Sequence, residues 1–214
     1  MSLVLHSYWR SSCSWRVRIA LHHKALDFES VAVHLVADGG QQHSEGHRSI
    51  NPMREIPVLM VGGVPIAQSM AILEFLEESY PEPALLPQGP LERARVRQMA
   101  ELINSGIQPI QNLRVMQRLG RDFDLPKSEQ MRWSKGWIDS GFQAFNSLVM
   151  KHGGTFCFRD TLSYADLCLV PQLYNARRFD VDLSPYPKLL EIEALLNEMP
   201  AFIKAHPDQQ ADAP

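Results

Sequence analysis

Residues 3–35 have the sequence LVLHSYWRSSCSWRVRIALHHKALDFESVAVHL, which predicts the architecture of the N-terminal part of the chain. Apolar and polar side chains alternate near both of its ends, over residues 3–8 and 31–35, which is typical of β-strands. Between them, apolar side chains recur at helical spacing from about residue 12 to residue 24. A strand, a helix and a strand in this order predict a βαβ unit with parallel strands.

A hairpin is predicted further along the chain. Two short apolar runs, residues 57–61 and 64–67, are joined by Gly62 and Gly63, which is typical of a two-residue turn between antiparallel strands. Pro65 has no N–H to donate to a neighbouring strand, so the second run is expected at the edge of the sheet.

A helix is predicted to follow from Gln68. Its apolar stripe consists of Ile72, Leu73 and Leu76. The glutamates of the same segment, Glu74, Glu77 and Glu78, are expected to point away from that stripe. The first part of the chain is therefore predicted to be βαβ followed by ββα.

The remainder of the chain is predicted to be helical. Residues 81–90 contain four prolines and one glycine and indicate a linker, because this composition cannot continue a helix. Helical patterns then cover residues 90–119, 128–152, 163–177 and 186–205. Ser163 and Asp166 form the pattern of a capping box at the start of the third. Residues 206–214 have no large apolar anchor and are expected to fray.

Composition excludes several classes of protein. The chain has 214 residues, 45% of them apolar, and a formal net charge of −3, so neither nucleic acid nor an anionic membrane is an expected partner. We find no signal-peptide pattern and no membrane-spanning stretch. Cys13, Cys157 and Cys168 form neither a CxxC pair nor an even disulfide set, which favours a reducing, cytoplasmic location. Cys157 and Cys168 are expected to be buried and inert, and Trp15, Trp133 and Trp137 to be packing residues.

The turn from the first strand into the first helix is the candidate reactive segment. It carries Ser11, Ser12, Cys13 and Ser14, at a helix start whose amides and dipole favour an anion. A thiolate there, from Cys13 or from a bound ligand, is stabilised by the dipole and by hydroxyl donors, which lowers its pKa. The alternative is that this serine-rich turn is only an N-cap.

The segment SSCSWRVRIAL at residues 11–21 resembles the characteristic sequence of zeta-class glutathione transferases, the maleylacetoacetate isomerases. Further segments that resemble this family are NPMREIPVL at 51–59, QSMAILEFLEE at 68–78, IQPIQNL at 107–113 and ADLCLVPQ at 165–172. The resemblance spans nearly the whole chain. It implies an α/β thioredoxin-like domain over residues 1–82 that binds glutathione, and an all-α domain over residues 90–214 that supplies much of the substrate pocket. It also implies a homodimer.

The resemblance implies a role for each matching residue. Ser11, with Ser12 and Cys13 in support, is expected to activate the glutathione thiol. Gln68 and Ser69 are expected to open a helix onto the γ-glutamyl carboxylate, and a cis Pro57 to present the backbone of Ile56 to the cysteinyl part of glutathione. The other residues expected at the tripeptide are Ser14, Trp15, Arg16, Gln42, Gln108, Asn112, Leu113 and Arg114, and Pro109 is expected to kink its helix beside them.

Two arginines are candidates for the substrate, because the family acts on small dicarboxylates and a guanidinium fork matches a carboxylate. Arg178 is the first choice and Arg10 the second, while either Arg177 or Arg178 is expected to be a solvated residue at a helix end. His43 and His47 have a spacing that suits a metal, but a surface helix explains it better, and no metal site is predicted.

The resemblance implies a cis–trans isomerisation that converts maleylacetoacetate to fumarylacetoacetate in the catabolism of phenylalanine and tyrosine, with side transferase activity. Addition of the glutathione thiolate makes the conjugated double bond single, so that it can rotate before the thiol leaves. The alternatives are a maleylpyruvate isomerase, a conjugating or dehalogenating transferase, an enzyme in which Cys13 itself forms a mixed disulfide with glutathione, and a non-catalytic protein on the same scaffold.

Overall fold

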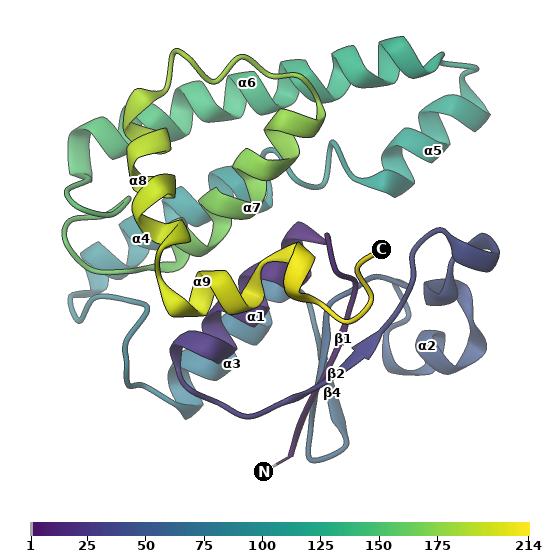
Figure 1. Cartoon of the computed structure of the whole chain (residues 1–214), viewed down its shortest axis with the longest axis horizontal. Coiled ribbons are helices and arrows are strands. Elements are labelled where there is room, and N and C mark those ends of the chain that lie inside the picture. Colours follow the sequence, from purple (N-terminus) through teal and green to yellow (C-terminus); the bar gives the residue numbers. More distant parts are fainter. Residues whose placement is uncertain (1) are drawn as a thin grey trace. The chain divides into compact units, whose positions relative to one another are not determined.

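A computed structural model describes residues 2–214 of the chain (Figure 1). By their internal contacts these residues form two compact units. The first runs up to Leu85 and also contains Asn197–Pro214, and the second is Leu86–Leu196. The predicted domains, 1–82 and 90–214, differ from these units mainly in where they place the C-terminal segment.

The first unit contains a four-stranded sheet in the order β2-β1-β3-β4. The strands are β1 (Leu3–Ser7), β2 (Glu29–Ala32), β3 (Val58–Val61) and β4 (Val64–Ala67). β1 is parallel to β2 and antiparallel to β3, and β3 is antiparallel to β4, which confirms both the βαβ unit and the hairpin. Gly62 and Gly63 have φ angles of 55° and 88°, as a two-residue hairpin turn requires. Pro65 lies on the edge strand, as predicted.

The second strand lies earlier than expected. It was predicted over residues 31–35 but ends at Ala32. Beyond it, Val33 still donates to the carbonyl oxygen of Ser7 (2.7 Å), but Nδ1 of His34 accepts from the amide of Ala37 (2.8 Å). This side-chain bond closes a turn and ends the strand.

Four helices belong to the first unit. They are α1 (Ser12–His23), α2 (Glu45–Ile50), α3 (Ser69–Ser79) and α9 (Pro200–Ala205), with 3₁₀ turns at Ala37–Gly39, Gln41–His43 and Pro207–Gln209. Figure 1 shows α1 and α3 on one side of the sheet and α2 on the other. Leu5, Leu59 and Ile72, from β1, β3 and α3, are fully buried, so the sheet and the helices share one core.

Glu77 is not on the solvent side of α3, so its predicted position is wrong. It is 5% exposed and accepts from Nζ of Lys24 at 2.8 Å and from the amide of Leu85 at 3.0 Å. Lys24 also donates to the carbonyl oxygens of Tyr80 (2.7 Å) and Pro83 (2.9 Å). A buried ammonium needs such partners, and this need outweighs the amphipathic pattern of the helix.

The second unit is built from helices, as predicted. They are α4 (Pro90–Asn104), α5 (Leu113–Asp122), α6 (Lys127–His152), α7 (Tyr164–Arg178) and α8 (Pro187–Asn197), whose last residue is grouped with the first unit. α4 packs against both α6 and α7. The capping box at Ser163 is confirmed, because the side chain of Asp166 accepts from the amide of Ser163 at 2.9 Å.

Two predicted helices are interrupted. The pattern over 90–119 is broken between Asn104 and Leu113, so Pro109 lies outside any helix and the predicted kink is wrong. Proline disfavours helical backbone at the residue before it, here Gln108, and lacks the N–H that a helix interior needs. The pattern over 186–205 breaks before Pro200 for the same reason.

The C-terminal residues are anchored, contrary to the prediction that they fray. Pro207 is buried, and the side chain of Gln210 donates to the carbonyl oxygen of His206 (2.8 Å). The carboxylate of Asp212 accepts from the amide of Trp9 at 2.9 Å. Polar contacts thus replace the apolar anchor that the segment lacks.

None of the helices in the part of the chain that the structure describes is long and apolar enough to cross a bilayer.

Candidate functional site

Ser11 is the N-cap of α1. Its amide donates to the carbonyl oxygen of Tyr8 (3.0 Å), and its Oγ accepts from the amide of Ser14 at 3.2 Å. The backbone of Ser11 is extended, with φ −66° and ψ 118°. A hydroxyl that accepts an amide bond still has its own proton to donate. The N-cap interpretation is therefore confirmed, and it is compatible with a second role for the same hydroxyl.

The next three residues form the first turn of α1. Helix geometry leaves the first amides without an intrahelical acceptor, and the helix dipole favours a negative charge beside them. Ser12 and Ser14 are buried, whereas Cys13 is partly exposed. Within the described chain, the buried Oγ of Ser14 has no hydrogen-bond partner. The turn therefore offers donors to an anionic ligand atom.

Trp15 and Arg16 lie beneath this turn rather than on its surface. Trp15 is 2% exposed and its ring meets that of His206 edge-on at 5.3 Å. The guanidinium of Arg16 is fully buried and approaches Sδ of Met70 at 3.9 Å. The start of α1 is thereby tied to the start of α3, a contact that sequence patterns did not reveal.

The start of α3 is a second place suited to an anion. Gln68 has a φ of 73° and precedes Ser69, the buried first residue of the helix. Nε2 of Gln68 lies 3.5 Å from a carboxylate oxygen of Glu55. The positive end of the helix dipole and its first amides suit a carboxylate, as the family resemblance implies.

The Ile56–Pro57 peptide bond is cis, which confirms the prediction. Glu55, which precedes Ile56, is held by two hydrogen bonds to its carbonyl oxygen. This oxygen lies 3.0 Å from Nε2 of His47 and accepts from Nδ2 of Asn51 at 2.8 Å. Sequence reasoning missed both roles. The position of Asn51 inside the segment NPMREIPVL is the signal that could have indicated one.

The two histidines considered for a metal lie on different elements, so the surface-helix interpretation is wrong. His43 ends a 3₁₀ turn, while His47 belongs to α2 and is 6% exposed. Residues 2–214 contain no group of three His, Cys, Asp or Glu side chains that could hold a metal ion.

Gln42 is a buried polar residue of the first unit. Its Nε2 donates to the carbonyl oxygen of Leu35 (3.2 Å) and contacts the ring of His43 (3.2 Å). Its Oε1 is buried and has no partner among the residues described. Together with Ser14 Oγ and the two helix starts, this acceptor fits a ligand that carries both peptide groups and negative charge, as glutathione does.

Arg10 lies in the turn that leads to Ser11. Its guanidinium carbon is 5.4 Å from the centroid of the Trp9 ring and 6.0 Å from that of Tyr8. The side chain is partly exposed, so its charge is accessible to an anionic group.

The remaining candidates for glutathione lie together after α4, in the second unit. The amide of Gln108 donates to the carbonyl oxygen of Ile103 (2.9 Å). Asn112 is the N-cap of α5, and its Oδ1 accepts from the amide of Arg114 at 3.1 Å. Leu113 is 38% exposed and Arg114 is exposed. Gln108 and Asn112 therefore bond to near neighbours in the sequence.

Arg177 and Arg178 differ in their contacts. Arg177 donates from Nη1 and Nη2 to the two carboxylate oxygens of Glu193, at 2.6 and 2.5 Å. This hydrogen bonding raises the pKa of Arg177. Arg178 instead donates to the side-chain oxygen of Asn175 (3.2 Å) and lies near the ring of Phe179 (5.9 Å). Arg177 is thus the structural member of the pair.

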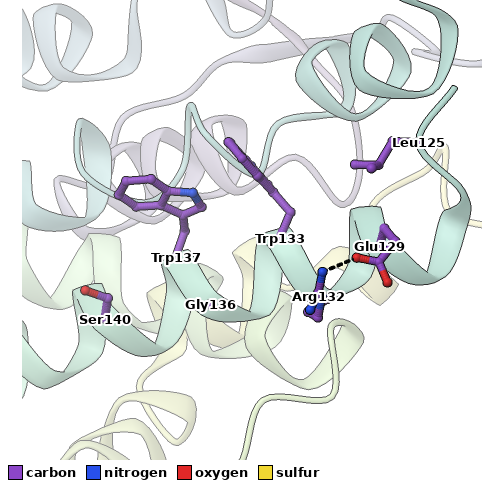
Figure 2. A pocket seen from close by; sticks show the side chains of 7 residues that line it. All are labelled: Leu125, Glu129, Arg132, Trp133, Gly136, Trp137 and Ser140. Carbon is purple, nitrogen blue, oxygen red and sulfur yellow. Dashed lines mark hydrogen bonds and ion pairs between the residues drawn. The ribbon is translucent and has the colours of Figure 1, made fainter. Parts of the chain in front are cut away.

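A shallow hollow of about 520 Å³ lies on α6, and Figure 2 shows Trp133 and Trp137 projecting from the same side of that helix toward it. The two residues are 39% and 43% exposed, so their predicted role in packing is wrong. Trp133 donates its indole N–H to the carbonyl oxygen of Ile110 (3.2 Å), while Arg132 pairs with Glu129.

Cys157 and Cys168 are fully buried, as predicted. Burial, and then the nearby Asp166, raises the pKa of the Cys157 thiol well above its usual range. Among the cysteines, Cys13 alone has surface exposure.

Comparisons with known proteins agree with this geometry. Residues 10–79 match the family model of the glutathione S-transferase N-terminal domain. The chain is 50% identical to maleylacetoacetate isomerase of Rattus norvegicus over 211 residues, which cover 99% of this chain and 95% of the relative. The holo structure of a bacterial zeta-class maleyl pyruvate isomerase has a TM-score of 0.95 at 39% identity, covering 99% of this chain and 100% of that one.

A third similar protein is maleylacetoacetate isomerase from Anaeromyxobacter dehalogenans 2CP-1. Its structure with GSH bound in the active site has a TM-score of 0.90 at 46% identity and covers 100% of this chain and 98% of that one. A second structure of that isomerase, with dicarboxyethyl glutathione and citrate in the active site, has a TM-score of 0.88 at 44% identity, with the same coverage.

Proposed function

This chain belongs to the family of zeta-class glutathione transferases and maleylacetoacetate isomerases, and we propose that it converts maleylacetoacetate to fumarylacetoacetate with glutathione as cofactor. The observation that carries the proposal is the position of the Ser11 hydroxyl, which caps α1 at the end of a thioredoxin-like strand and keeps its own proton available. The substrate is inferred from the family, and the stabilisation of the thiolate is inferred from the Ser11–Ser14 turn.

When bound, glutathione supplies the thiolate whose addition and departure allow the substrate double bond to rotate. The protein must then hold a sulfur anion at neutral pH. Ser11 donates its hydroxyl proton toward that charge, and the amides of Ser12 and Cys13 and the dipole of α1 stabilise it. Ser14 offers a further hydroxyl whose buried oxygen has no partner in the described chain.

Binding and orientation of glutathione fall to other residues of the first unit. Gln68 and Ser69 bind a carboxylate at the start of α3, and Ile56 and Pro57 bind the cysteinyl backbone. Gln42 contributes its side-chain amide. Trp15 and Arg16 support the turn from below. For the second unit, the family resemblance implies further contacts from Gln108, Asn112, Leu113 and Arg114.

Arg178 and Arg10 bind the carboxylates of the substrate. Arg178 is preferred over Arg177 because Arg177 already holds Glu193 through its fork. A guanidinium that holds a carboxylate fixes both its place and its orientation, which brings the double bond into a reactive position.

Maleylpyruvate is the second candidate substrate. The zeta-class maleyl pyruvate isomerase resembles this chain at a TM-score of 0.95, and the same turn serves a slightly shorter diacid. Cys13 as the reactive thiol is a further alternative, which predicts that Cys13→Ala abolishes activity.

We also propose a cytoplasmic homodimer that acts in the catabolism of phenylalanine and tyrosine. Three free cysteines support the reducing location. The dimer and the pathway rest on the family alone.

The direct test measures turnover of maleylacetoacetate and maleylpyruvate by the purified protein, each with glutathione, with S-methylglutathione and with neither. We expect turnover only with glutathione, and faster turnover of maleylacetoacetate. S-methylglutathione is the matched control, because it keeps the peptide but blocks the thiol. Equal turnover under all three conditions would contradict the proposal, and faster turnover of maleylpyruvate would select the second substrate.

A further inference from the structure

Arg18 is a fully buried cation in the middle of α1. Its guanidinium donates to Oγ of Ser7 at 2.9 Å and to the carbonyl oxygen of Trp9 at 2.7 Å. The same side chain reaches the carbonyl oxygen of Ala205 through Nε (3.2 Å) and Nη2 (3.1 Å). One side chain thus joins segments from opposite ends of the chain, all of them within the first unit.

Asp212 makes a second connection between the same segments. Its carboxylate accepts from the amide of Trp9 at 2.9 Å. Trp9 is therefore held at its amide by Asp212 and at its carbonyl oxygen by Arg18. α9 packs directly on α1, and the ring of His206 meets that of Trp15. The C-terminal segment is consequently bound along the start of α1.

The held residues lead directly into the thiol-binding turn. The carbonyl oxygen of Tyr8 accepts from the amide of Ser11 (3.0 Å) and lies 3.4 Å from Nη1 of Arg18. The side chain of Arg10 stacks over Trp9. Arg18 and Asp212 themselves make their contacts with Ser7, Tyr8, Trp9 and Ala205, and so act on Ser11 only through the backbone between them.

We propose that Arg18 and Asp212 are positioning residues that clamp the C-terminal segment to Tyr8 and Trp9 and thereby fix the place of the Ser11 hydroxyl. This inference rests on the proposed function, because the orientation of the Ser11 hydroxyl matters only if that hydroxyl donates to the thiolate of bound glutathione. A hydrogen bond weakens steeply as its angle departs from linear, so a small movement of the turn reduces the stabilisation of a bound thiolate. The C-terminal segment, from Ala205 to Asp212, thus contributes indirectly to the activation of the thiol.

The ionisable groups around the clamp are few. Burial lowers the pKa of Arg18 to about 10, and the carboxylate of Asp212 opposes this shift. Arg18 remains charged at neutral pH. His22, one turn further along α1, has a pKa lowered first by burial and then by Lys204 and Arg18. Neither group changes charge between neutral and mildly alkaline pH. The partly exposed thiol of Cys13 lies in the same turn, so the titration of the protein without glutathione is subtracted to follow the bound thiol alone.

The test compares Asp212→Ala with Asp208→Ala in the full-length protein. Asp208 is the matched control, because it is an exposed carboxylate on the same segment, paired with His206 at 3.6 Å. The thiol of bound glutathione is titrated by the ultraviolet absorbance of its thiolate, alongside the pH profile of kcat/KM and the melting temperature. Asp212→Ala is expected to raise the thiol pKa by about half a unit, which lowers the ratio of thiolate to thiol about threefold at any given pH. The loss in kcat/KM should disappear at alkaline pH.

A purely structural role predicts a different result. It lowers the melting temperature of Asp212→Ala but leaves the thiol titration as in the wild type and in Asp208→Ala, and that outcome overturns the clamp. Arg18→Lys keeps the charge but loses the fork, and is expected to shift the thiol pKa in the same direction. If the wild type itself shows no thiolate with glutathione, the proposed function fails and the clamp with it. A wild-type thiolate with an unchanged Asp212→Ala titration overturns the clamp alone.

Discussion

In the first unit, the segments next to the Ser11–Ser14 turn are joined by buried polar groups to distant parts of the chain, whereas Gln108 and Asn112, after α4 in the second unit, bond to their sequence neighbours. Arg18 joins β1 and the following turn to Ala205, and Lys24 joins α1 to Glu77. By contrast, Oδ1 of Asn112 accepts from the amide of Arg114 two residues away, and on the same helix Arg118 pairs with Asp122 four residues away.

This difference indicates how the two regions respond to change. A buried ion pair or fork leaves an uncompensated charge when one partner is removed, so substitutions in the first unit should cost much stability or activity. Exposed local pairs contribute little to stability. Substitutions after α4 should therefore alter binding more than folding, which suits residues that select a substrate.

The largest effect is expected for Glu77→Gln. It leaves the buried ammonium of Lys24 without its carboxylate and should lower the free energy of unfolding by about 3–5 kcal/mol. Urea denaturation measures this loss. Glu78→Gln changes the exposed neighbour on the same helix and should stay within about 0.5 kcal/mol of the wild type. Similar losses for both variants would remove the contrast between buried and local polar contacts.

Ser11→Ala is expected to have the next largest effect. Loss of one donor to a developing or bound anion should reduce kcat/KM with maleylacetoacetate by about 10²-fold. Loss of the N-cap itself should cost about 1 kcal/mol of stability. Ser163→Ala is the control, because it removes an N-cap serine from α7 in the second unit and should leave activity intact. Full activity in Ser11→Ala would mean that this hydroxyl serves only as the N-cap of α1.

Arg178→Ala should have a smaller effect that is confined to the substrate. We expect the KM for maleylacetoacetate to rise about tenfold, with little change in the affinity for glutathione, because a charge-assisted hydrogen bond contributes about 1.5–3 kcal/mol. Arg177→Ala is the matched variant and should leave KM unchanged while it frees Glu193. If Arg177→Ala alone raises KM, the assignment of the two arginines is reversed.

The smallest effect concerns two histidines at the end of α1. Burial lowers the pKa of His22 and of His23 below the usual value near 6.5. Below about pH 6.5 the unfolded chain therefore binds more protons than the folded one, and stability falls as the pH drops toward the folded-state pKa values. Both side chains are partly exposed, so solvent screening keeps the loss small.

Urea midpoints at about pH 7.5 and about pH 5.5 measure this loss. His22→Gln should show a smaller drop than the wild type. A His22→Gln drop as large as that of the wild type would contradict the assignment.

Sequence patterns predicted the elements that depend on local periodicity. The hairpin with Gly62 and Gly63, the start of α1 and the capping box at Ser163 follow from short-range chemistry and are found as expected. Glu77, His47 and Asp212 were misjudged because their partners, Lys24, the Glu55 carbonyl oxygen and Trp9, are brought near them only by the fold. The interruption at Pro109 was foreseen only as a kink, since a pattern of apolar residues does not reveal where a helix ends and resumes.

The candidate site divides in the same way. The turn at Ser11–Ser14 and the cis bond before Pro57 follow from a long, specific family segment and from the strand–turn–helix order. The support beneath them, from Arg16 with Met70 and from Arg18 with Ala205, depends on contacts between helices and segments that no spacing rule encodes.

The thiol pKa of bound glutathione shows whether the Ser11–Ser14 turn stabilises a thiolate. It is measured by ultraviolet titration of the wild-type complex and of the Ser11→Ala complex, with free glutathione as reference. The wild-type value should lie clearly below the value of about 8.5 typical of a free cysteine thiol, and Ser11→Ala should return it toward that value. An equal pKa in the wild-type complex and in free glutathione would show that the turn does not stabilise the thiolate.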